Sequence, residues 1–205
     1  MDERDKRRVG ELVEPGDRRK APGRLELLQR FLNTWNHEFP PEWDRLGSPE
    51  RAAGWLGRKR LVPQGTVVTG AEAARLRELR EAIRVLAVAN RDGVRPPTAA
   101  SAAIRRASRA ARLIVETDPT GRTRLEPSTA GVPGAVAALL GILHEAQLRG
   151  DWRRMKACRQ CEYVFFDRSK NRSAAWCAMS ICGNRTKNRA YRRRQAVTWS
   201  TRRSS

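Results

Sequence analysis

Residues 158–182 read CRQCEYVFFDRSKNRSAAWCAMSIC, and this stretch contains all four cysteines of the 205-residue chain. The spacing is Cys-x2-Cys-x15-Cys-x4-Cys, so that each close pair can turn onto one ion while the insert folds back between the pairs. This pattern predicts one structural Zn²⁺ held by Cys158, Cys161, Cys177 and Cys182. Four protein ligands leave no position for water, which disfavours a catalytic metal.

Two other chemistries are open to the four thiols at this point. Disulfides need an oxidising compartment, and structural disulfide cysteines are usually spread along a chain to join distant loops. An iron–sulfur cluster also uses all-cysteine ligation. Zinc is favoured because nearby basic residues would offset the negative charge of an ion bound by four thiolates; these are Arg153, Arg154, Lys156 and Arg159.

The residues around the cysteines predict a small zinc ribbon or treble-clef-like hairpin followed by a basic helix. Residues 163–166 have the composition of a short strand. Tyr163 and Trp176 could stack on bases, but so small a module first needs its aromatic residues for a core. Residues 183–195 contain no proline, and their arginines recur at helical spacing, at Arg185, Arg189, Arg192 and Arg193. Such a stripe could follow a phosphate backbone, although a solvated charged helix shows the same pattern.

The charge of the chain is concentrated near this site. The formal net charge is +20, and residues 151–205 contribute +12 of it, with 15 Lys and Arg against three acids. A surface this basic either binds an anionic partner or is solvated. DNA is the first candidate partner, and folded RNA is the alternative, because small basic fingers also bind RNA through shape and phosphate.

The remainder of the chain is expected to be mainly α-helical. Apolar periodicity and capping residues predict five helices, which begin near Arg24, Pro49, Thr69, Thr98 and Pro133. One small β-hairpin is predicted from residues 113–117 and 122–126, because Asp118-Pro119-Thr120-Gly121 between them is a turn sequence.

We place a domain boundary at residues 150–151. The predicted organisation is a disordered leader (1–22), a helical domain (23–150), a four-cysteine finger (151–196) and a disordered tail (197–205). Because the binding energy of the metal is folding energy for the finger alone, we expect chelation to unfold the finger and to leave residues 24–150 helical.

The sequence also indicates where the protein works. No stretch approaches the roughly 18 to 20 apolar residues of a membrane helix, and the N-terminus lacks the apolar core of a secretory signal. We therefore expect a cytoplasmic protein without a membrane partner. Catalysis would depend on His37, Glu38, His144 and Glu145, of which His144 lies in an apolar helical pattern, so no enzymatic activity and no catalytic residue are predicted.

Four motifs in the C-terminal segment carry a family resemblance. They are CRQC at 158–161, FFDRSKNR at 165–172, WCAM at 176–179 and CGNR at 182–185. Together they closely resemble the CGNR zinc finger family. The N-terminal part is similar to the ABATE domain that usually accompanies this finger, through FLNT at 31–34, DRL at 44–46, AGWL at 53–56 and LREAIR at 79–84.

The resemblance implies a bacterial, stress-related transcription regulator whose finger binds DNA. The four cysteines match the zinc ligands of the family. The basic residues expected to contact nucleic acid are Arg168, Lys170, Arg172, Arg185, Lys187, Arg189, Arg192 and Arg193. At residues 174–175 this chain has two alanines where the family tends to have arginines, which removes charge from one phosphate-facing edge.

The helical domain is expected to sense a ligand or to mediate association, including formation of a homodimer. Asn33, Thr34 and Asp44 are polar residues beside apolar helix faces and are predicted to line a small-molecule pocket, because buried polar groups must be paired. Helix termination and capping explain the same residues equally well.

Overall fold

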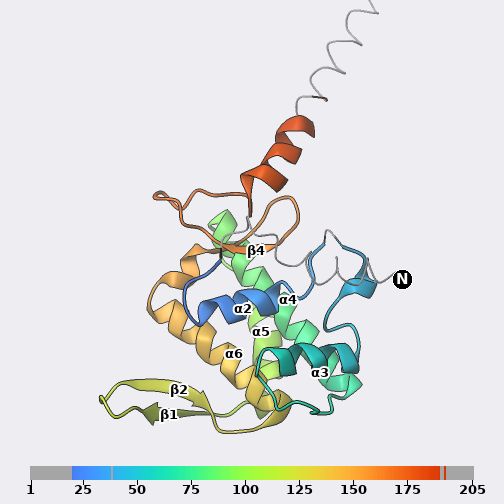
Figure 1. Cartoon of the computed structure of the whole chain (residues 1–205). Helices are drawn as coiled ribbons and strands as arrows, with labels where there is room; N and C mark the ends of the chain where they lie inside the picture. Colours follow the sequence, from blue (N-terminus) through green and yellow to red (C-terminus); the bar gives the residue numbers. More distant parts are fainter. Residues whose placement is uncertain (1–19, 38, 190–191, 193–205) are drawn as a thin grey trace, which may run out of the picture.

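The N-terminal body of the protein is built from α-helices (Figure 1). The computed structural model describes residues 20–37, 39–189 and 192. Its helices in this body are α2 (Leu25–Leu32), α3 (Pro49–Arg58), α4 (Gly70–Asp92), α5 (Thr98–Ala107) and α6 (Gly131–Leu148). Short 3₁₀ turns are η1 (Pro41–Trp43), η2 (Ser108–Ala110) and η3 (Asp151–Arg154). The predicted mainly helical domain is thereby confirmed.

Local capping chemistry sets the ends of two helices where the sequence placed them. The Ser48 hydroxyl accepts a hydrogen bond from the backbone N–H of Arg51 in the first turn of α3. At the start of α4, the Thr69 hydroxyl accepts from the Glu72 N–H, and the Glu72 carboxylate accepts from the Thr69 N–H at 2.8 Å. This reciprocal capping box satisfies two backbone donors that a helix start otherwise leaves unpaired.

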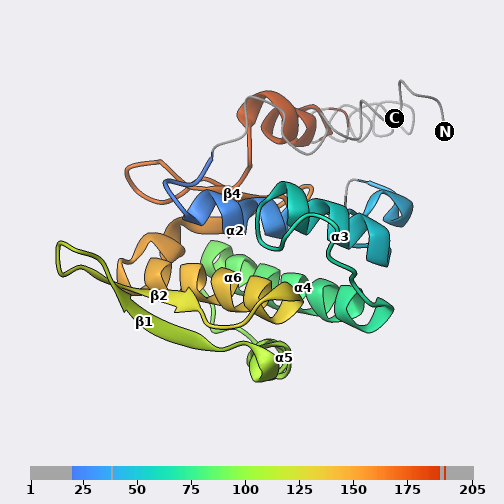
Figure 2. The ribbon, with the colours of Figure 1, turned by 60° about the horizontal axis from the view of Figure 1, so that its bottom comes forward.

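The longest helix, α4, is central to the fold. It contacts α2, α3 and α5, and α6 packs against α2. Figure 2 shows α2 and α3 in one layer above α4 and α6. The largest side chains of the shared core are fully buried and include Leu28, Phe31, Trp55, Leu79 and Ile83.

The predicted hairpin forms beside α6. Strands β1 (Leu113–Thr117) and β2 (Thr123–Pro127) are antiparallel, with Leu113 opposite Pro127. The Asp118 carboxylate accepts hydrogen bonds from the backbone N–H groups of Thr120 and Arg122, which fixes the turn. Strand β2 lies between β1 and α6, so β1 is the outer strand (Figures 1 and 2).

A second, shorter hairpin follows η3, and its side chains contribute to two hydrophobic clusters. Strands β3 (Met155–Ala157) and β4 (Val164–Phe166) are antiparallel, and Val164 and Phe166 join the apolar core of the helices. Phe165 instead joins a second cluster with the four cysteines. Side chains of a strand point alternately to its two faces, which explains this division. The apolar core therefore crosses residue 150, while the independence of the two predicted domains stays a prediction.

Helix α6 is long and apolar. Its 18 residues have a mean hydropathy of 1.2, which is enough by length and composition to cross a membrane. The sequence expectation that no stretch reaches this length was wrong for α6. In this structure the apolar residues of α6 are covered by protein and not by lipid. The helix packs against α2 and β2, and 56% of its residues are buried. The helix has the burial of a core helix.

The predicted leader and tail lie largely outside the described residues. Of the leader, residues 20–22 are described, and Ala21 is buried in the core. Its N–H donates to the Gln29 side chain at 2.7 Å. The predicted tail (197–205) and Arg193 lie entirely outside the described part of the chain.

Candidate metal centre and nucleic-acid interface

The first two cysteines lie in the tight turn that joins β3 to β4. Cys158 follows β3 directly, and its N–H donates to the Tyr163 carbonyl at 2.9 Å. The Glu162 N–H donates back to the Cys158 carbonyl, also at 2.9 Å. Glu162 adopts a left-handed conformation with φ of +56°, which reverses the chain within a few residues. The turn therefore brings the Cys158 and Cys161 thiols toward one point.

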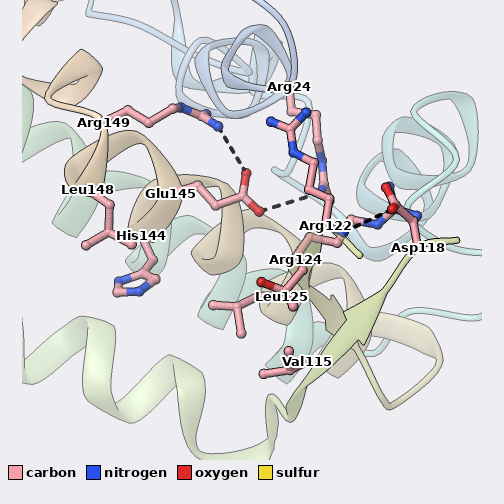
Figure 3. Close-up of a pocket in the computed structure, with 11 residues that line it drawn as sticks. Arg24, Val115, Asp118, Arg122, Arg124, Leu125, His144, Glu145, Leu148 and Arg149 are labelled. Carbon is pink, nitrogen blue, oxygen red and sulfur yellow. Dashed lines mark hydrogen bonds and ion pairs between the residues drawn. The ribbon is translucent and has the colours of Figure 1, made fainter. Parts of the chain in front are cut away.

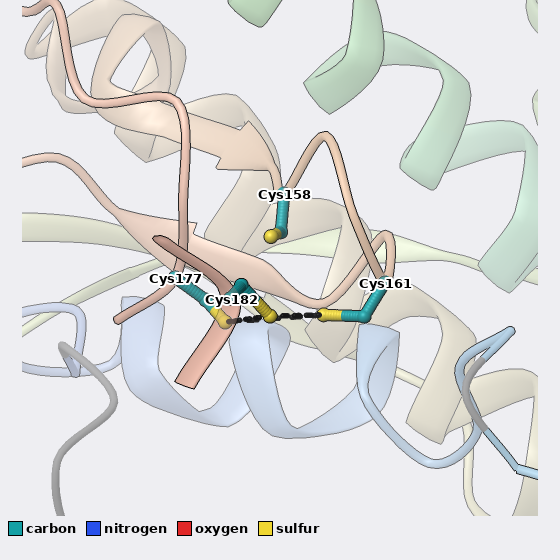
Figure 4. Close-up of side chains that lie close together, drawn as sticks. All are labelled: Cys158, Cys161, Cys177 and Cys182. Carbon is teal, nitrogen blue, oxygen red and sulfur yellow. Dashed lines mark hydrogen bonds between the residues drawn. The ribbon is translucent and has the colours of Figure 1, made fainter. Parts of the chain in front are cut away.

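The second pair comes from the segment after β4. Cys177 ends a loop that is tied to the first pair by the Arg159 N–H, which donates to a carbonyl of this loop at 3.0 Å. Cys182 lies in the π-helical turn η4 (Met179–Gly183), immediately before the helical residues 184–189. Figure 4 shows the side chains of Cys161, Cys177 and Cys182 converging, with Cys158 projecting toward them from the end of β3. All four side chains are buried.

The sulfur geometry fits one zinc ion. The four Sγ atoms lie within 4.8 Å of one another. Three of their separations are 3.8 Å (Cys161 to Cys177), 3.7 Å (Cys177 to Cys182) and 3.6 Å (Cys182 to Cys161). A regular tetrahedron with Zn–S bonds of about 2.3 Å has edges of about 3.8 Å. Disulfides would require sulfur atoms about 2.05 Å apart, and a cluster of several irons would hold the sulfurs farther apart, so the cofactor is one structural Zn²⁺.

The thiols themselves show why a cation is needed. Hydrogen bonds from the Cys161 and Cys177 thiols lower the pKa of Cys158. The hydrogen bond with Cys158 raises the pKa of Cys161, and burial raises the pKa of Cys182. Ionising one thiol thus opposes ionising its neighbours, because like charges repel. A divalent cation at the centre removes this opposition.

The basic residues that lie near Cys158 and Cys161 are in part not the ones that the sequence predicted. The Lys156 ammonium is buried and pairs with the Asp167 carboxylate at 2.9 Å. Arg91 of α4 reaches this site instead, with Nη1 3.5 Å from the Ala157 carbonyl oxygen. Its hydrogen bond with Asp92 raises the pKa of Arg91, and the negative charges of Asp92, Glu162 and Cys158 raise it further. Nothing in the sequence pattern connects α4 with the cysteines.

A buried carboxylate shapes the loop that ends at Cys177. Asp167 accepts hydrogen bonds from the N–H and hydroxyl of Ser169 at 2.9 and 2.7 Å, and from the Ala174 N–H at 3.0 Å. Burial opposes ionisation of Asp167, but these hydrogen bonds and Lys156 lower its pKa. The charged form is thereby held in place, and it fixes the course of residues 167–174.

Helices α2 and α4 dock the metal hairpin onto the body. The Asn33 side chain donates to the Val164 carbonyl and accepts from the Val164 N–H, both at 2.8 Å. Arg84, which is almost fully buried, donates to the Glu162 carbonyl at 2.8 Å and to the Trp35 carbonyl at 2.7 Å. These contacts join α2, α4 and the turn that holds the first two cysteines.

Two family models match the chain. The CGNR zinc finger matches residues 154–195, and ABATE, described as "Putative stress-induced transcription regulator", matches residues 25–162. The chain belongs to the ABATE family. Both resemblances inferred from the sequence are confirmed, and no curated protein matches the chain. The two matches overlap at residues 154–162, where the metal hairpin of this ABATE protein docks onto the helices.

These families identify a zinc-binding regulatory protein, and neither of them is enzymatic. The histidines that were considered for catalysis lie far apart in the sequence and in different surroundings. His37 Nε2 lies 3.1 Å from a carboxylate oxygen of Glu162, at the surface. His144 is exposed on α6.

The three residues predicted for a ligand pocket all have hydrogen-bond partners within the protein. Asn33 is paired with Val164, as described above. Arg80 Nη1 and Nη2 bind the two oxygens of the Asp44 carboxylate at 2.6 and 2.9 Å, and Nη1 also donates to the Thr34 hydroxyl at 3.0 Å. Asp44 and Arg80 line a cavity of about 380 Å³. Ligand binding by Asn33, Thr34 and Asp44 stays a prediction.

A larger cavity of about 530 Å³ lies between the turn of the β1–β2 hairpin, the end of α6 and the start of α2 (Figure 3). Its cationic lining residues are Arg24, Arg122, Arg124 and Arg149. Apolar lining is supplied by Val115, Leu125 and Leu148. Glu145 bridges Arg24 and Arg149, each at 3.8 Å. Sequence reasoning missed this site because its residues come from three distant segments.

The basic residues of the finger lie in two segments. In the loop after β4, Arg168 stacks over the Phe166 ring with its guanidinium carbon 5.8 Å from the ring centroid, and it donates to the Lys20 carbonyl. Lys170 and Arg172 of the same loop are exposed. The helix that follows Cys182 carries further exposed cations, namely Arg185, Lys187, Arg189 and Arg192. This helix projects away from the helical body (Figure 1).

Proposed function

We propose that this protein is a zinc-dependent, DNA-binding transcription regulator of the cytoplasm. The observation that carries the proposal is the position of Cys182. This ligand lies two residues before the helix of residues 184–189, so the metal fixes the direction of a helix that exposes Arg185 and Arg189 on one side and Lys187 on the other. Stress response is the process that the family description associates with such a regulator.

The charge of this region supports a polyanionic partner. Residues 168–205 contain 11 Lys and Arg and no Asp or Glu. Cations that contact phosphates release condensed counterions, which gives affinity that falls steeply with salt. A helix of this charge that projects from the body can lie in the major groove or along the backbone.

We further propose that the 530 Å³ cavity is the sensing site of the ABATE domain. The cavity lining has four arginines against two acids, Asp118 and Glu145, together with apolar side chains. This excess of positive charge suits a small organic anion, such as a carboxylate or a phosphate ester. Within the described residues the Arg122 guanidinium has no ion-pair partner, so it is available to a ligand. Arg149 pairs with Asp151 at 3.5 Å in η3, the turn that leads into β3 and Cys158, which offers a route from ligand to finger.

The test of DNA binding compares two triple variants of the zinc-loaded full chain. Arg185→Gln, Lys187→Gln and Arg189→Gln together remove three charges from the finger helix. The matched control removes three exposed charges from the helical body through Arg75→Gln, Arg95→Gln and Arg109→Gln. Both proteins are titrated with genomic duplex fragments over a salt series, and retained fragments are sequenced.

We expect the finger variant to lose discrete fragments that the wild type and the control retain. The slope of log affinity against log salt should fall by about 0.9 for each phosphate contact removed. Equal binding by the two variants would refute a role for the finger helix. Retention of folded RNA in preference to duplex DNA would instead assign the finger to RNA or ribosome binding.

A further inference from the structure

The outer edge of β1 has backbone groups that point away from its own sheet. The Ser128 N–H donates to the Arg112 carbonyl and the Asp118 N–H donates to the Arg122 carbonyl, both at 3.0 Å. In an antiparallel pair, every second residue exchanges hydrogen bonds with its neighbour strand. Residues 112, 114, 116 and 118 therefore face β2, and the N–H and C=O groups of residues 113, 115 and 117 face outward. No element of the described chain lies along this edge (Figures 1 and 2).

The centre of this edge, residues 113–115, is also apolar and unprotected. Leu113, Ile114 and Val115 are 37%, 43% and 66% exposed. Sheet edges are normally guarded by charged side chains, proline or a bulge, because a bare edge pairs with other strands. Residues 113–115 contain none of these devices. The strand is therefore suited to accept another strand along its outer edge.

The sequence of β1 is complementary to itself when two copies run antiparallel. With Ile114 opposite Ile114 of a second copy, Leu113 lies opposite Val115 and Arg112 lies opposite Glu116. Neither Arg112 nor Glu116 has an ion-pair partner within the described residues, and this register gives each of them one. Opposite charges across strands stabilise a sheet.

Neighbouring registers are less favourable. A pairing of Val115 with Val115 would place Ile114 opposite Glu116, and a pairing of Leu113 with Leu113 would place Ile114 opposite Arg112. Each would put an apolar side chain beside an unpaired charge. The charge pattern thus selects one register.

We propose that the protein forms a two-fold symmetric dimer in which the β1 strands of two copies pair antiparallel about Ile114. The two hairpins then form one four-stranded sheet in the order β2-β1-β1-β2, and each copy contributes the outer edge of its β1 to the interface. The dimer goes beyond DNA binding and does not depend on it. If the finger does bind DNA, two copies related by a two-fold axis favour a palindromic target.

The first test is the oligomeric state of the zinc-loaded full chain, measured by analytical ultracentrifugation over a concentration series without nucleic acid. We expect a dimer whose dissociation constant rises more than about tenfold in Val115→Lys, since symmetry places the substitution in the interface twice. The matched control is Val67→Lys, because Val67 is 85% exposed outside the strand; it should dimerise like the wild type.

A charge exchange tests the register. Arg112→Glu should weaken the dimer, and the double variant Arg112→Glu, Glu116→Arg should restore it, because both cross-strand pairs are rebuilt in reverse. Circular dichroism confirms that each variant is folded. A dimer whose dissociation constant is unchanged by these substitutions, or a chain that is monomeric at all concentrations, would overturn the proposal.

Covalent trapping locates the axis. In this register the two Ile114 residues form a non-hydrogen-bonded pair with Cα atoms about 4.5 Å apart, which lies within the range for a disulfide. Mild oxidation of zinc-loaded Ile114→Cys should give a covalent dimer, whereas Val94→Cys, at another exposed position, should not. Equal cross-linking of the two variants would contradict the assigned axis. None of these readouts involves DNA, so failure of the dimer and failure of the regulator are separate outcomes.

Discussion

The side-chain amide of Asn33 pairs with the backbone of Val164 as a neighbouring strand would, through two hydrogen bonds of 2.8 Å. Asn33 caps the end of α2, and Val164 begins β4, three residues after the zinc ligand Cys161. The Gln29 amide, one helical turn earlier, donates to the same carbonyl at 3.1 Å. The backbone N–H and C=O groups at the edge of the metal hairpin therefore find their hydrogen-bond partners on helix α2 of the body.

Replacement of Asn33 by alanine should destabilise the protein and loosen its zinc. The Val164 N–H would be left buried without a partner, which costs about 1–3 kcal/mol. We expect a lower midpoint of denaturant unfolding and faster transfer of zinc to a chromogenic chelator. Asn171→Ala, at an exposed position of the finger loop, is the control and should change neither. Unchanged zinc release in Asn33→Ala would show that docking does not support the metal site.

Removal of zinc should affect the finger far more than the helices. Without the metal, crowded thiols no longer hold the loop of residues 167–178 and the helix of residues 184–189 together, while α2, α4 and α6 retain their own core. Hydrogen exchange measured by peptide should rise strongly in these two segments after chelation and little in α4.

Hydrogen exchange in β3 and β4 distinguishes loss of the finger alone from loss of the whole fold. Because Met155 and Val164 belong to the helical core, we expect these strands to keep part of their protection without zinc. Uniform loss of protection through the whole chain would mean that the metal stabilises a single cooperative unit. Cys177→Ser should reproduce the effect of chelation.

Gly134 is required by a close approach of the chain at the start of α6. A Cβ atom there would lie 2.0 Å from the Thr129 carbonyl oxygen, and backbone atoms cannot move aside as a flexible side chain can. We expect Gly134→Ala to lower the free energy of unfolding by about 1–3 kcal/mol or more, as overpacking does. Thermal unfolding monitored by circular dichroism measures the change.

Gly141 on the same helix is the matched control. A Cβ atom there would meet its nearest neighbour, a methyl carbon of Leu113, at 3.6 Å, an ordinary contact distance. Alanine is favoured over glycine in a helix by up to about 1 kcal/mol. Gly141→Ala should therefore leave stability unchanged or raise it. Similar losses in both variants would argue against the close approach as the cause.

The buried ion pair of Arg80 and Asp44 should show strong coupling in a double-variant cycle. Arg80→Met leaves the Asp44 carboxylate buried without its partner, which costs about 3–5 kcal/mol. Combining it with Asp44→Asn removes the stranded charge and keeps an acceptor for the Leu46 N–H, which Asp44 binds at 2.8 Å. We expect the double variant to be more stable than Arg80→Met alone in urea unfolding. Arg75→Met, on the exposed face of α4, should have almost no effect.

The features that could be predicted depend on residues close together in the chain. The cysteine spacing predicted the metal centre, and the caps at Ser48 and Thr69 predicted where α3 and α4 begin, because ligand pairs and capping groups act within a few residues. The turn at residues 118–121 predicted the first hairpin for the same reason. Family motifs added the order of the two modules.

Only the tertiary structure decided which of these elements touch. The Asn33 amide meets a strand that lies 131 residues later. Arg84 reaches the residue that follows the second zinc ligand, Cys161, and four arginines from three segments surround one cavity. A periodic pattern shows that a helix has a buried face but does not say what covers it. For that reason the sequence determined the zinc ligands and where the helices begin, and the packing of the chain determined that the metal hairpin shares a core with the helical body.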